Sequence, residues 1–396
     1  MSLESTPRSN QLHIGIYGRR NSGKSSLINA ITNQEISLVS DVLGTTTDPV
    51  YKTMEINGIG PCVFIDTAGI DDQGELGMKR VEKTKLAIDK TDVALIICTS
   101  TYLTEEAKWV ELLKNKGVSY LTVINKSDLI KNIKEVKDAV EKELGSSPFI
   151  VSAVNKEGIE ELIAGIADHL PADFEKSSIV GDLAVEGDTV LLVMPQDIQA
   201  PKGRLILPQV QILREKIKKK CIVTSVTTDK LDIALASYAQ PPKLIITDSQ
   251  IFDLVCSKKP MESKLTSFSV LFAGYKGDIG YYVDSAKKID ELTKDSKVLI
   301  AEACTHVPLA EDIGREQIPR LLRNLVGPEL VVDVVCGGDF PEDLTGYDLV
   351  IQCGACMFNR KYVMSRIDTA RAQNVPMSNY GVAIAHIKGI LDKVSF

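Results

Sequence analysis

Three cysteines in the last third of the chain stand where metal ligands or redox thiols could lie. Cys304 ends an apolar run and is followed two residues later by His306, and Cys353 and Cys356 form a C-x-x-C pair within IQCGACM at 351–357. Thiolates from separate strand ends are soft ligands that suit zinc or an iron–sulfur cluster. A C-x-x-C pair at the start of a helix also suits a thioredoxin-like redox site, because the helix N-terminus lowers a thiol pKa.

The third cysteine favours a metal, because a redox pair needs only two thiols. A structural zinc site takes four protein ligands, which these three cysteines and His306 could supply. A 4Fe-4S cluster held by the three cysteines would leave its fourth iron to His306, to a carboxylate or to an exchangeable ligand. The residue types alone leave zinc and iron–sulfur open.

A glycine-rich segment near the start of the chain predicts phosphate binding. It reads G-x-x-x-x-G-K-S at 18–25 and lies between an apolar strand and a helical pattern, as this motif requires. Backbone N–H groups of such a loop wrap the phosphates, Lys24 reaches the β and γ oxygens, and the Ser25 hydroxyl ligates magnesium. The loop residues that we expect to contact the nucleotide are Gly18, Asn21, Ser22, Gly23, Lys24, Ser25 and Ser26.

The magnesium and γ-phosphate side of this site is predicted from two further segments. Asp66 ends the strand CVFID and is placed to hold magnesium through water, and the N–H of Gly69 is available to the γ-phosphate. The loop SDVLGTTTDPV lies where GTPases close over the γ-phosphate. We expect Thr46 to ligate magnesium there, with Thr45 and Thr47 as alternatives.

The base is predicted to be guanine. The strand LTVIN ends in N-K-x-D, formed by Asn125, Lys126 and Asp128. Guanine offers two adjacent N–H donors that one carboxylate can accept, so Asp128 selects GTP over ATP. The strand FIV ends at the Ser152–Ala153 turn, which would present backbone N–H groups to the guanine carbonyl.

All of these motifs follow apolar strand candidates, so a parallel sheet must gather the strand ends into one crevice. Strand and helix patterns alternate along the chain, which predicts an α/β fold. We expect a P-loop GTPase domain over residues 1–172, followed by two smaller parallel-sheet α/β domains. Residues 179–262 would form a dimerisation or interaction domain, and residues 266–396 the metal-cluster domain.

Composition limits the other classes of function. The net charge of −7 over 396 residues argues against a broad nucleic-acid surface, and the basic run at 214–220 reads as the solvated face of a helix. No apolar stretch is long enough to cross a bilayer, and the first ten residues lack the apolar core of a signal peptide. We therefore expect a cytoplasmic protein that does not bind membranes and has reduced cysteines.

The GTPase motifs resemble those of the tRNA-modification GTPase MnmE and its relatives, which share GTT followed closely by Asp and an asparagine in the phosphate loop. That asparagine corresponds to Asn21 and implies a potassium ion that substitutes for an arginine finger. The residue after DTAG is Ile70, where many GTPases carry a glutamine that orients water. Glu75 is the nearest match to the family's water-orienting glutamate, and hydrolysis should be slow and stimulated by potassium.

The order of parts resembles the HydF family, the GTPase maturation factors of iron–iron hydrogenases, over nearly the whole chain. The resemblance rests on the MnmE-like GTPase, the middle segment with GRLILPQVQ, and C-x-H followed by C-x-x-C. It implies a 4Fe-4S cluster on Cys304, Cys353 and Cys356, with His306 as the histidine of the first motif. The family usually has a second histidine where this chain has Gln352, so the fourth position would fall to a carboxylate or a small exchangeable ligand.

The resemblance also implies partners. A homodimer, or a tetramer, would receive a transient two-iron precursor cluster from radical-SAM maturases and deliver it to apo iron–iron hydrogenase, with GTP as a switch. The alternative is an RNA-modification or other regulatory GTPase with a zinc-binding C-terminal domain.

Overall fold

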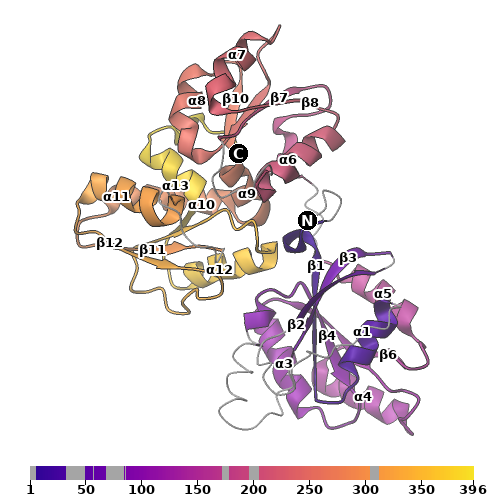
Figure 1. Ribbon diagram of the computed structural model, residues 1–396. Helices are drawn as coiled ribbons and strands as arrows, with labels where there is room; N and C mark the ends of the chain where they lie inside the picture. The colour runs from indigo at the N-terminus through magenta and orange to yellow at the C-terminus, as the bar shows by residue number, and fades with distance from the viewer. Residues whose placement is uncertain are drawn as a thin grey trace. The chain divides into compact units, whose positions relative to one another are not determined.

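The computed structural model describes most of the chain, shown in colour in Figure 1. The described residues are 6–32, 50–56, 58–67, 84, 86–171, 178–195, 205–303 and 312–396. They form three sheets within two compact units, Met1–Glu175 and Lys176–Phe396. The predicted α/β fold class, with one larger sheet followed by two smaller parallel ones, is confirmed.

The N-terminal unit is built on a doubly wound sheet in the order β2-β3-β1-β4-β5-β6, in which only the β2–β3 pair is antiparallel among the described strands. Its strands are β1 (Leu12–Gly18), β2 (Val50–Ile56), β3 (Gly60–Asp66), β4 (Val93–Cys98), β5 (Ser119–Ile124) and β6 (Phe149–Ile150). Its helices are α1 (Lys24–Thr32), α3 (Thr104–Asn115), α4 (Ile133–Leu144) and α5 (Ile159–Asp168). Both β1 and β4 are buried along their whole length, as expected for strands covered on both faces.

Two hydrophobic clusters explain this arrangement. One lies between the sheet and helices α1 and α5, and the other between the sheet and helices α3 and α4. The predicted nucleotide residues among the described ones lie at or just after the carboxyl ends of strands in this sheet.

The second unit contains two parallel sheets. The middle sheet has the order β10-β9-β7-β8 and the C-terminal sheet the order β12-β11-β13-β14. The middle strands are β7 (Thr189–Val193), β8 (Ile222–Val226), β9 (Leu244–Thr247) and β10 (Lys264–Ser267). The C-terminal strands are β11 (Lys297–Ala301), β12 (Val331–Val335), β13 (Leu349–Gln352) and β14 (Met377–Asn379).

Helices cover these sheets and connect them. Those near the middle sheet are α6 (Leu207–Lys218), α7 (Leu231–Ala236), α8 (Phe252–Lys258) and α9 (Phe268–Lys276). Those near the C-terminal sheet are α10 (Ile279–Ala286), α11 (Ile318–Val326), α12 (Arg360–Ala372) and α13 (Tyr380–Ile387). Helix α9 packs against α6 and also against α12 and α13, between the two sheets (Figure 1). One hydrophobic cluster includes residues of both sheets, so they share a core.

The sequence placed the second domain boundary between residues 262 and 266. Strand β10 lies at this boundary and pairs in register with β9, so the middle sheet extends to Ser267. The domain limits stay a proposal. Among the described helices, none has the length and apolar character to cross a membrane.

Candidate functional site

The phosphate loop connects the end of β1 to the start of α1. The Lys24 ammonium folds back over this loop and donates to the carbonyls of Gly18 and Arg19, each at 2.9 Å. Asn21 is exposed and has a left-handed backbone, with φ of 61°. Ser22 is buried, Ser25 is partly buried, and Ser26 is exposed at the start of the helix. The loop therefore places the ammonium of Lys24 and several hydroxyl groups at the carboxyl edge of the sheet.

A glycine is needed at position 23 because the side chain of Asn125 lies very close to its backbone. Its φ is +87°, and a Cβ atom there would lie 2.4 Å from Nδ2 of Asn125. That amide donates to the carbonyl of Ser22 at 3.0 Å, and its oxygen accepts from the N–H of Ala153 at 3.3 Å. Asn125 thus joins the phosphate loop to the turn that was predicted to hold guanine.

The predicted guanine residues lie next to one another. The hydroxyl of Ser152 donates to Oδ1 of Asp128 at 2.6 Å and accepts from the N–H of Asn155 at 3.2 Å. Asp128 is exposed, whereas Ser152 is buried and Lys126 is partly buried. A buried hydroxyl therefore orients an accessible carboxylate, which is what recognition of two adjacent N–H donors needs.

Asp66 has the features of a group that holds magnesium through water. It ends β3, opposite Ile16 of β1. Among the described residues its buried Oδ1 atom has no hydrogen-bond partner. Burial raises the pKa of this carboxyl group, and Lys24 and Lys52 oppose the shift. A buried carboxylate oxygen that has no partner among the described residues, and that lies within the electrostatic reach of Lys24 of the phosphate loop, fits a hydrated magnesium ion.

Three predicted catalytic residues, Thr46, Gly69 and Glu75, lie outside the described residues, as does Ile70. Their roles therefore stay predictions.

One contact of the phosphate loop was missed by sequence reasoning. Arg19 pairs with Glu106 of α3 at 3.1 Å and lies over the ring of Tyr102, 4.5 Å from its centroid. Glu106 is almost fully buried. The two partners are 87 residues apart, so no local pattern could have joined them.

The cysteine region lies at the carboxyl edge of the C-terminal sheet. The N–H of Cys353 donates to the carbonyl of Ala301 at 3.0 Å, which continues the pairing of β13 with β11. Its sulfur accepts from the N–H groups of Ala303 at 3.1 Å and Ala355 at 3.4 Å. Burial raises the pKa of the Cys353 thiol to about 11 in the metal-free protein, against the effect of those N–H groups. Cys304 and His306 lie outside the described residues.

Cys356 lies in the turn that follows, where the N–H of Phe358 donates to the carbonyl of Ala355 at 3.0 Å. Ala355 has a left-handed φ of 49°, and the partly buried Cys356 packs against the hydrophobic cluster of the middle sheet. Beside the turn, Lys276 is almost fully buried. Burial lowers the pKa of Lys276 to about 7, and the thiols of Cys356 and Cys353 oppose the shift. The turn thus combines two thiols with a buried amine that no sequence motif indicated.

Gln352 is buried and engaged in the core. Its amide nitrogen donates to the hydroxyl of Tyr282 at 3.4 Å, and its oxygen accepts from Arg366 at 3.5 Å. Arg366 is itself buried between aromatic rings and donates to the carbonyl of Gly337 at 2.6 Å. Both ends of the Gln352 amide therefore have protein partners, which does not suit a metal ligand.

The described part of the chain contains no group of three or more metal-binding side chains. It does include two of the three cysteines predicted as ligands, both in the turn that follows β13. Ala303, which contacts the sulfur of Cys353, directly precedes the third cysteine in the sequence. These donors fit a metal centre with thiolate ligands.

Comparison with protein families assigns all three parts of the chain. Models of the hydrogen maturase F dimerization domain and tetramerization domain match residues 179–277 and 280–395, which together make up more than half of the chain. A model of the 50S ribosome-binding GTPase family matches residues 13–126.

Similar curated proteins cover a smaller part. The chain is 34% identical over 176 residues to the GTPase Der of Kosmotoga olearia, a match to 41% of this chain and 40% of that protein. It is 34% identical over 175 residues to the tRNA modification GTPase MnmE of Thermotoga maritima, a match to 42% of this chain and 37% of that protein. The match thus spans less than half the length of either relative. A solved structure of Aquifex aeolicus Era bound to GDP and AlF4− matches 54% of this chain and 92% of its own, at 20% identity and a TM-score of 0.35.

Proposed function

Since the chain belongs to the hydrogen maturase F (HydF) family, we propose that it holds a 4Fe-4S cluster, accepts a two-iron precursor and delivers it to apo iron–iron hydrogenase. The chain is a GTP hydrolase, because its N-terminal part matches a GTPase domain. The observation that carries the cluster proposal is the hydrogen bond from Ala303 to the sulfur of Cys353 at 3.1 Å. It links the chain that leads to Cys304 with the C-x-x-C turn.

The geometry supports a division of roles within the GTP site. Asp128 reads the two N–H donors of guanine, and the hydroxyl of Ser152 keeps its carboxylate in place. The ammonium of Lys24 compensates phosphate charge, while Ser25 and Asp66 hold magnesium, Asp66 through water. Magnesium, when bound, neutralises charge on the β and γ oxygens. The unpartnered Oδ1 of Asp66 supports this assignment within the described residues.

Potassium stimulation is the finer proposal for hydrolysis. Asn21 is exposed at the phosphate loop, where its side chain can help hold a potassium ion. Thr46, Gly69 and Glu75 complete the proposed catalytic set. Hydrolysis should be faster in potassium than in sodium chloride, and Asn21→Ala should remove the difference. Equal wild-type rates in the two salts would exclude this role.

The cluster would be held by Cys304, Cys353 and Cys356. When bound, it supplies an iron centre that can store an electron and offer one further coordination position. Because the amide of Gln352 is engaged by Tyr282 and Arg366, we assign the fourth position to another protein group, His306 included, or to a small exchangeable ligand. The two-iron precursor is cargo from the radical-SAM maturases.

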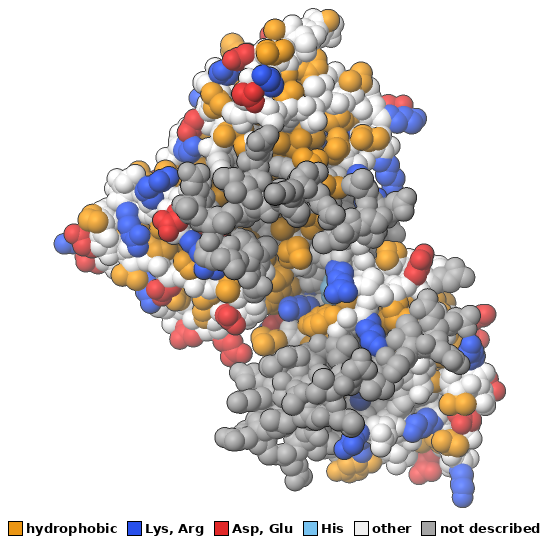
Figure 2. All heavy atoms as spheres, viewed as in Figure 1, with side chains coloured by type: hydrophobic (Ala, Val, Ile, Leu, Met, Phe, Trp, Pro, Cys, Tyr) orange, Lys and Arg blue, Asp and Glu red, His pale blue; other side chains and the backbone are white. Residues whose placement is uncertain are grey.

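Self-association is supported by the matched dimerization and tetramerization domains. The edge strands β8 and β12 expose apolar side chains, including Ile222 at 60% and Val331 at 48%. Figure 2 shows apolar side chains gathered on the visible face of the part that contains β7 to β10. Exposed apolar edge strands are surfaces on which a second copy can pair.

Anaerobic reconstitution with iron and sulfide tests the proposal. We expect about four irons and four sulfides per chain and an electron paramagnetic resonance signal after reduction, both lost in Cys353→Ser. Uptake of one zinc and no iron would overturn the cluster and support a zinc-binding regulatory GTPase. RNA binding with a steep salt dependence would instead support an RNA-modification enzyme.

A further inference from the structure

Helix α9 contacts the cysteine turn at its C-terminal end. The ammonium of Lys276, the last residue of this helix, donates to the carbonyls of Ala355 at 3.4 Å and Cys356 at 3.2 Å, and also to that of Phe358. A lysine ammonium has three donors, and here each one has a carbonyl acceptor in the same turn. The side chain is 1% exposed, so water cannot replace it readily.

The same helix contacts the cysteine segment at its N-terminal end. The hydroxyl of Ser269 donates to Oδ1 of Asn379 at 3.0 Å, and Nδ2 of Asn379 donates to the carbonyl of Cys353 at 3.3 Å. The two cysteine backbones are thus held by opposite ends of α9, one directly and one through Asn379.

In a third contact, a side chain that follows the cysteine turn donates to the end of α9. Arg360, which begins α12 just after the turn, donates to the carbonyls of Tyr275 at 3.3 Å and Gly277 at 3.0 Å. These carbonyls belong to the end of α9 and would otherwise lack partners from within the helix. The helix end and the turn therefore satisfy each other's backbone groups.

The contact of Lys276 with the cysteine turn joins two segments that belong to different family models. Lys276 lies in the segment matched by the dimerization domain, and Cys353 and Cys356 lie in the segment matched by the tetramerization domain. Cys356 also packs against the cluster that contains Phe268, Leu271 and Phe272 of α9. The cysteine turn is therefore built partly on the dimerization segment.

We propose that Lys276 is a positioning residue of the metal site, which fixes the C-x-x-C turn so that Cys353 and Cys356 face one metal centre. The proposal rests on the proposed function only for the identity of the metal. Ala355 adopts a conformation that residues other than glycine rarely adopt, and such a conformation persists only when its surroundings hold it. The three hydrogen bonds from Lys276 supply that restraint. A consequence is that a change in the dimerization segment reaches the metal ligands through α9.

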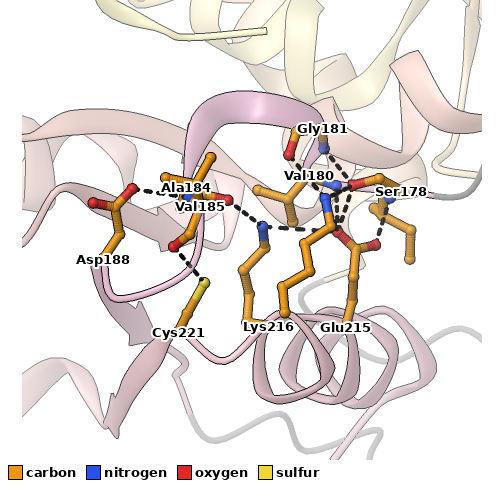
Figure 3. A network of polar contacts seen from close by, with 11 residues as sticks. Ser178, Val180, Gly181, Ala184, Val185, Asp188, Glu215, Lys216 and Cys221 are labelled. Carbon is orange, nitrogen blue, oxygen red and sulfur yellow. Dashed lines mark hydrogen bonds and ion pairs between the residues drawn. The ribbon is translucent and has the colours of Figure 1, made fainter.

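The test compares two buried lysines. Lys276→Met keeps the apolar stem and removes the donors. Lys216→Met is the matched control, because Lys216 is also fully buried in the same unit and donates to a backbone carbonyl, that of Ala184 at 3.1 Å. Figure 3 shows Lys216 beside Glu215, in a network that ties the segment from Ser178 to Asp188 to α6. Among the described residues, the ammonium of Lys216 contacts Ala184 and Glu215 and does not contact the cysteine turn.

The first readout is alkylation of individual cysteines in the metal-free protein, followed by mass spectrometry. Lys276→Met should raise the alkylation rate of Cys356 by about tenfold, as expected when a buried hydrogen-bonded turn opens more often. Lys216→Met should leave that rate unchanged. Equal Cys356 rates in wild type and Lys276→Met, or equal increases in both variants, would overturn the proposal.

The second readout is the metal content and resonance spectrum of the reconstituted protein. After anaerobic reconstitution, Lys276→Met should bind less metal and give an altered resonance spectrum for each cluster bound, and Lys216→Met should give the wild-type spectrum. An unchanged spectrum in Lys276→Met would contradict the positioning role. If wild type binds no iron, the proposed function fails, and the alkylation result still decides the role of Lys276.

A milder variant covers the case in which Lys276→Met does not fold. Ser269→Ala removes the hydrogen bond at the other end of α9 and should raise the alkylation of Cys353 by a smaller factor. If Lys276→Met does not fold and Ser269→Ala leaves both cysteines as unreactive as in wild type, the proposal is wrong.

Discussion

The nucleotide site and the cysteine site both follow the carboxyl ends of parallel strands, yet their lysines are positioned by contacts of very different range. Lys24 donates to a carbonyl six residues away in the sequence, whereas Lys276 donates to a carbonyl eighty residues away. The first lysine is held by carbonyls of its own loop, those of Gly18 and Arg19. The second lysine, Lys276, is positioned only after α9 and the cysteine turn have packed together. The nucleotide site should therefore tolerate changes in the rest of the chain better than the cysteine site does.

The largest expected effect tests whether the two sites are separate. Lys24→Ala should lower GTP hydrolysis by about 10²- to 10³-fold, because it removes a preorganised donor from the phosphates. Iron content after reconstitution should not change. The measurements are steady-state hydrolysis and iron analysis on the same preparation.

The reciprocal variant is the control. Cys356→Ser should lose the cluster and keep the wild-type rate of GTP hydrolysis. A loss of iron in Lys24→Ala would show that the sites depend on each other and would weaken the comparison.

The next effect concerns the base. Asp128→Asn replaces an acceptor of two N–H donors with an amide that repels one of them, so the kcat/KM for GTP should fall by about 10²-fold. Hydrolysis of xanthosine triphosphate, whose base offers an acceptor at that position, should rise. Asp138→Asn, at an exposed position of α4, is the control and should leave both substrates unaffected. Unchanged selectivity in Asp128→Asn would remove this residue from the guanine site.

Sequence reasoning located three of the predicted nucleotide residues correctly in the fold. It predicted that Asp66, Asn125 and Ser152 follow strand ends, and the structure places them there. The chemistry of these residues requires fixed neighbours, so their spacing in the sequence carries the information.

Sequence reasoning failed where buried polar groups meet across long separations. The run at 214–220 was interpreted as a solvated helix face, which is wrong for Lys216, because its side chain is fully buried against Ala184. Lys276 gave no signal either, since a lysine in the last turn of a helix is ordinarily exposed. Both lysines are buried because distant carbonyls need donors, and periodicity does not report such pairs.

An effect of intermediate size is expected from a substitution that tests how closely the phosphate loop packs against Asn125. Gly23→Ala should destabilise the N-terminal domain by about 2 kcal/mol, because it combines a left-handed backbone with displacement of the Asn125 amide. GTP affinity should also fall. The chain has one tryptophan, and the buried Trp109 lies in this domain, so its fluorescence during urea unfolding reports on the domain alone.

Gly58→Ala separates the two causes. Gly58 has nearly the same φ, +88°, but a Cβ atom there would have no atom of the described residues within 4 Å. The Gly58→Ala variant should lower the free energy of unfolding by about 1 kcal/mol and leave GTP affinity unchanged. Equal losses in the two variants would mean that the contact with Asn125 contributes nothing.

The smallest effect concerns the ion pair between Arg19 of the phosphate loop and Glu106 of α3. Glu106→Gln keeps the side-chain volume and removes the charge that pairs with Arg19 at 3.1 Å. We expect a loss of about 1 kcal/mol in the unfolding transition of Trp109, because Glu106 is buried and a hydrogen bond to a charged group is stronger than a neutral one. Glu105→Gln is the matched control, since Glu105 pairs with Lys108 on the surface and should change stability by less than about 0.5 kcal/mol. If the two variants are equally stable, the pair of Arg19 with Glu106 does not stabilise the phosphate loop, which then depends on its local contacts and on the Asn125 amide. A larger loss in Glu106→Gln would show that α3 supports the phosphate loop as α9 supports the cysteine turn, so that the two sites differ in the number of long-range contacts they need.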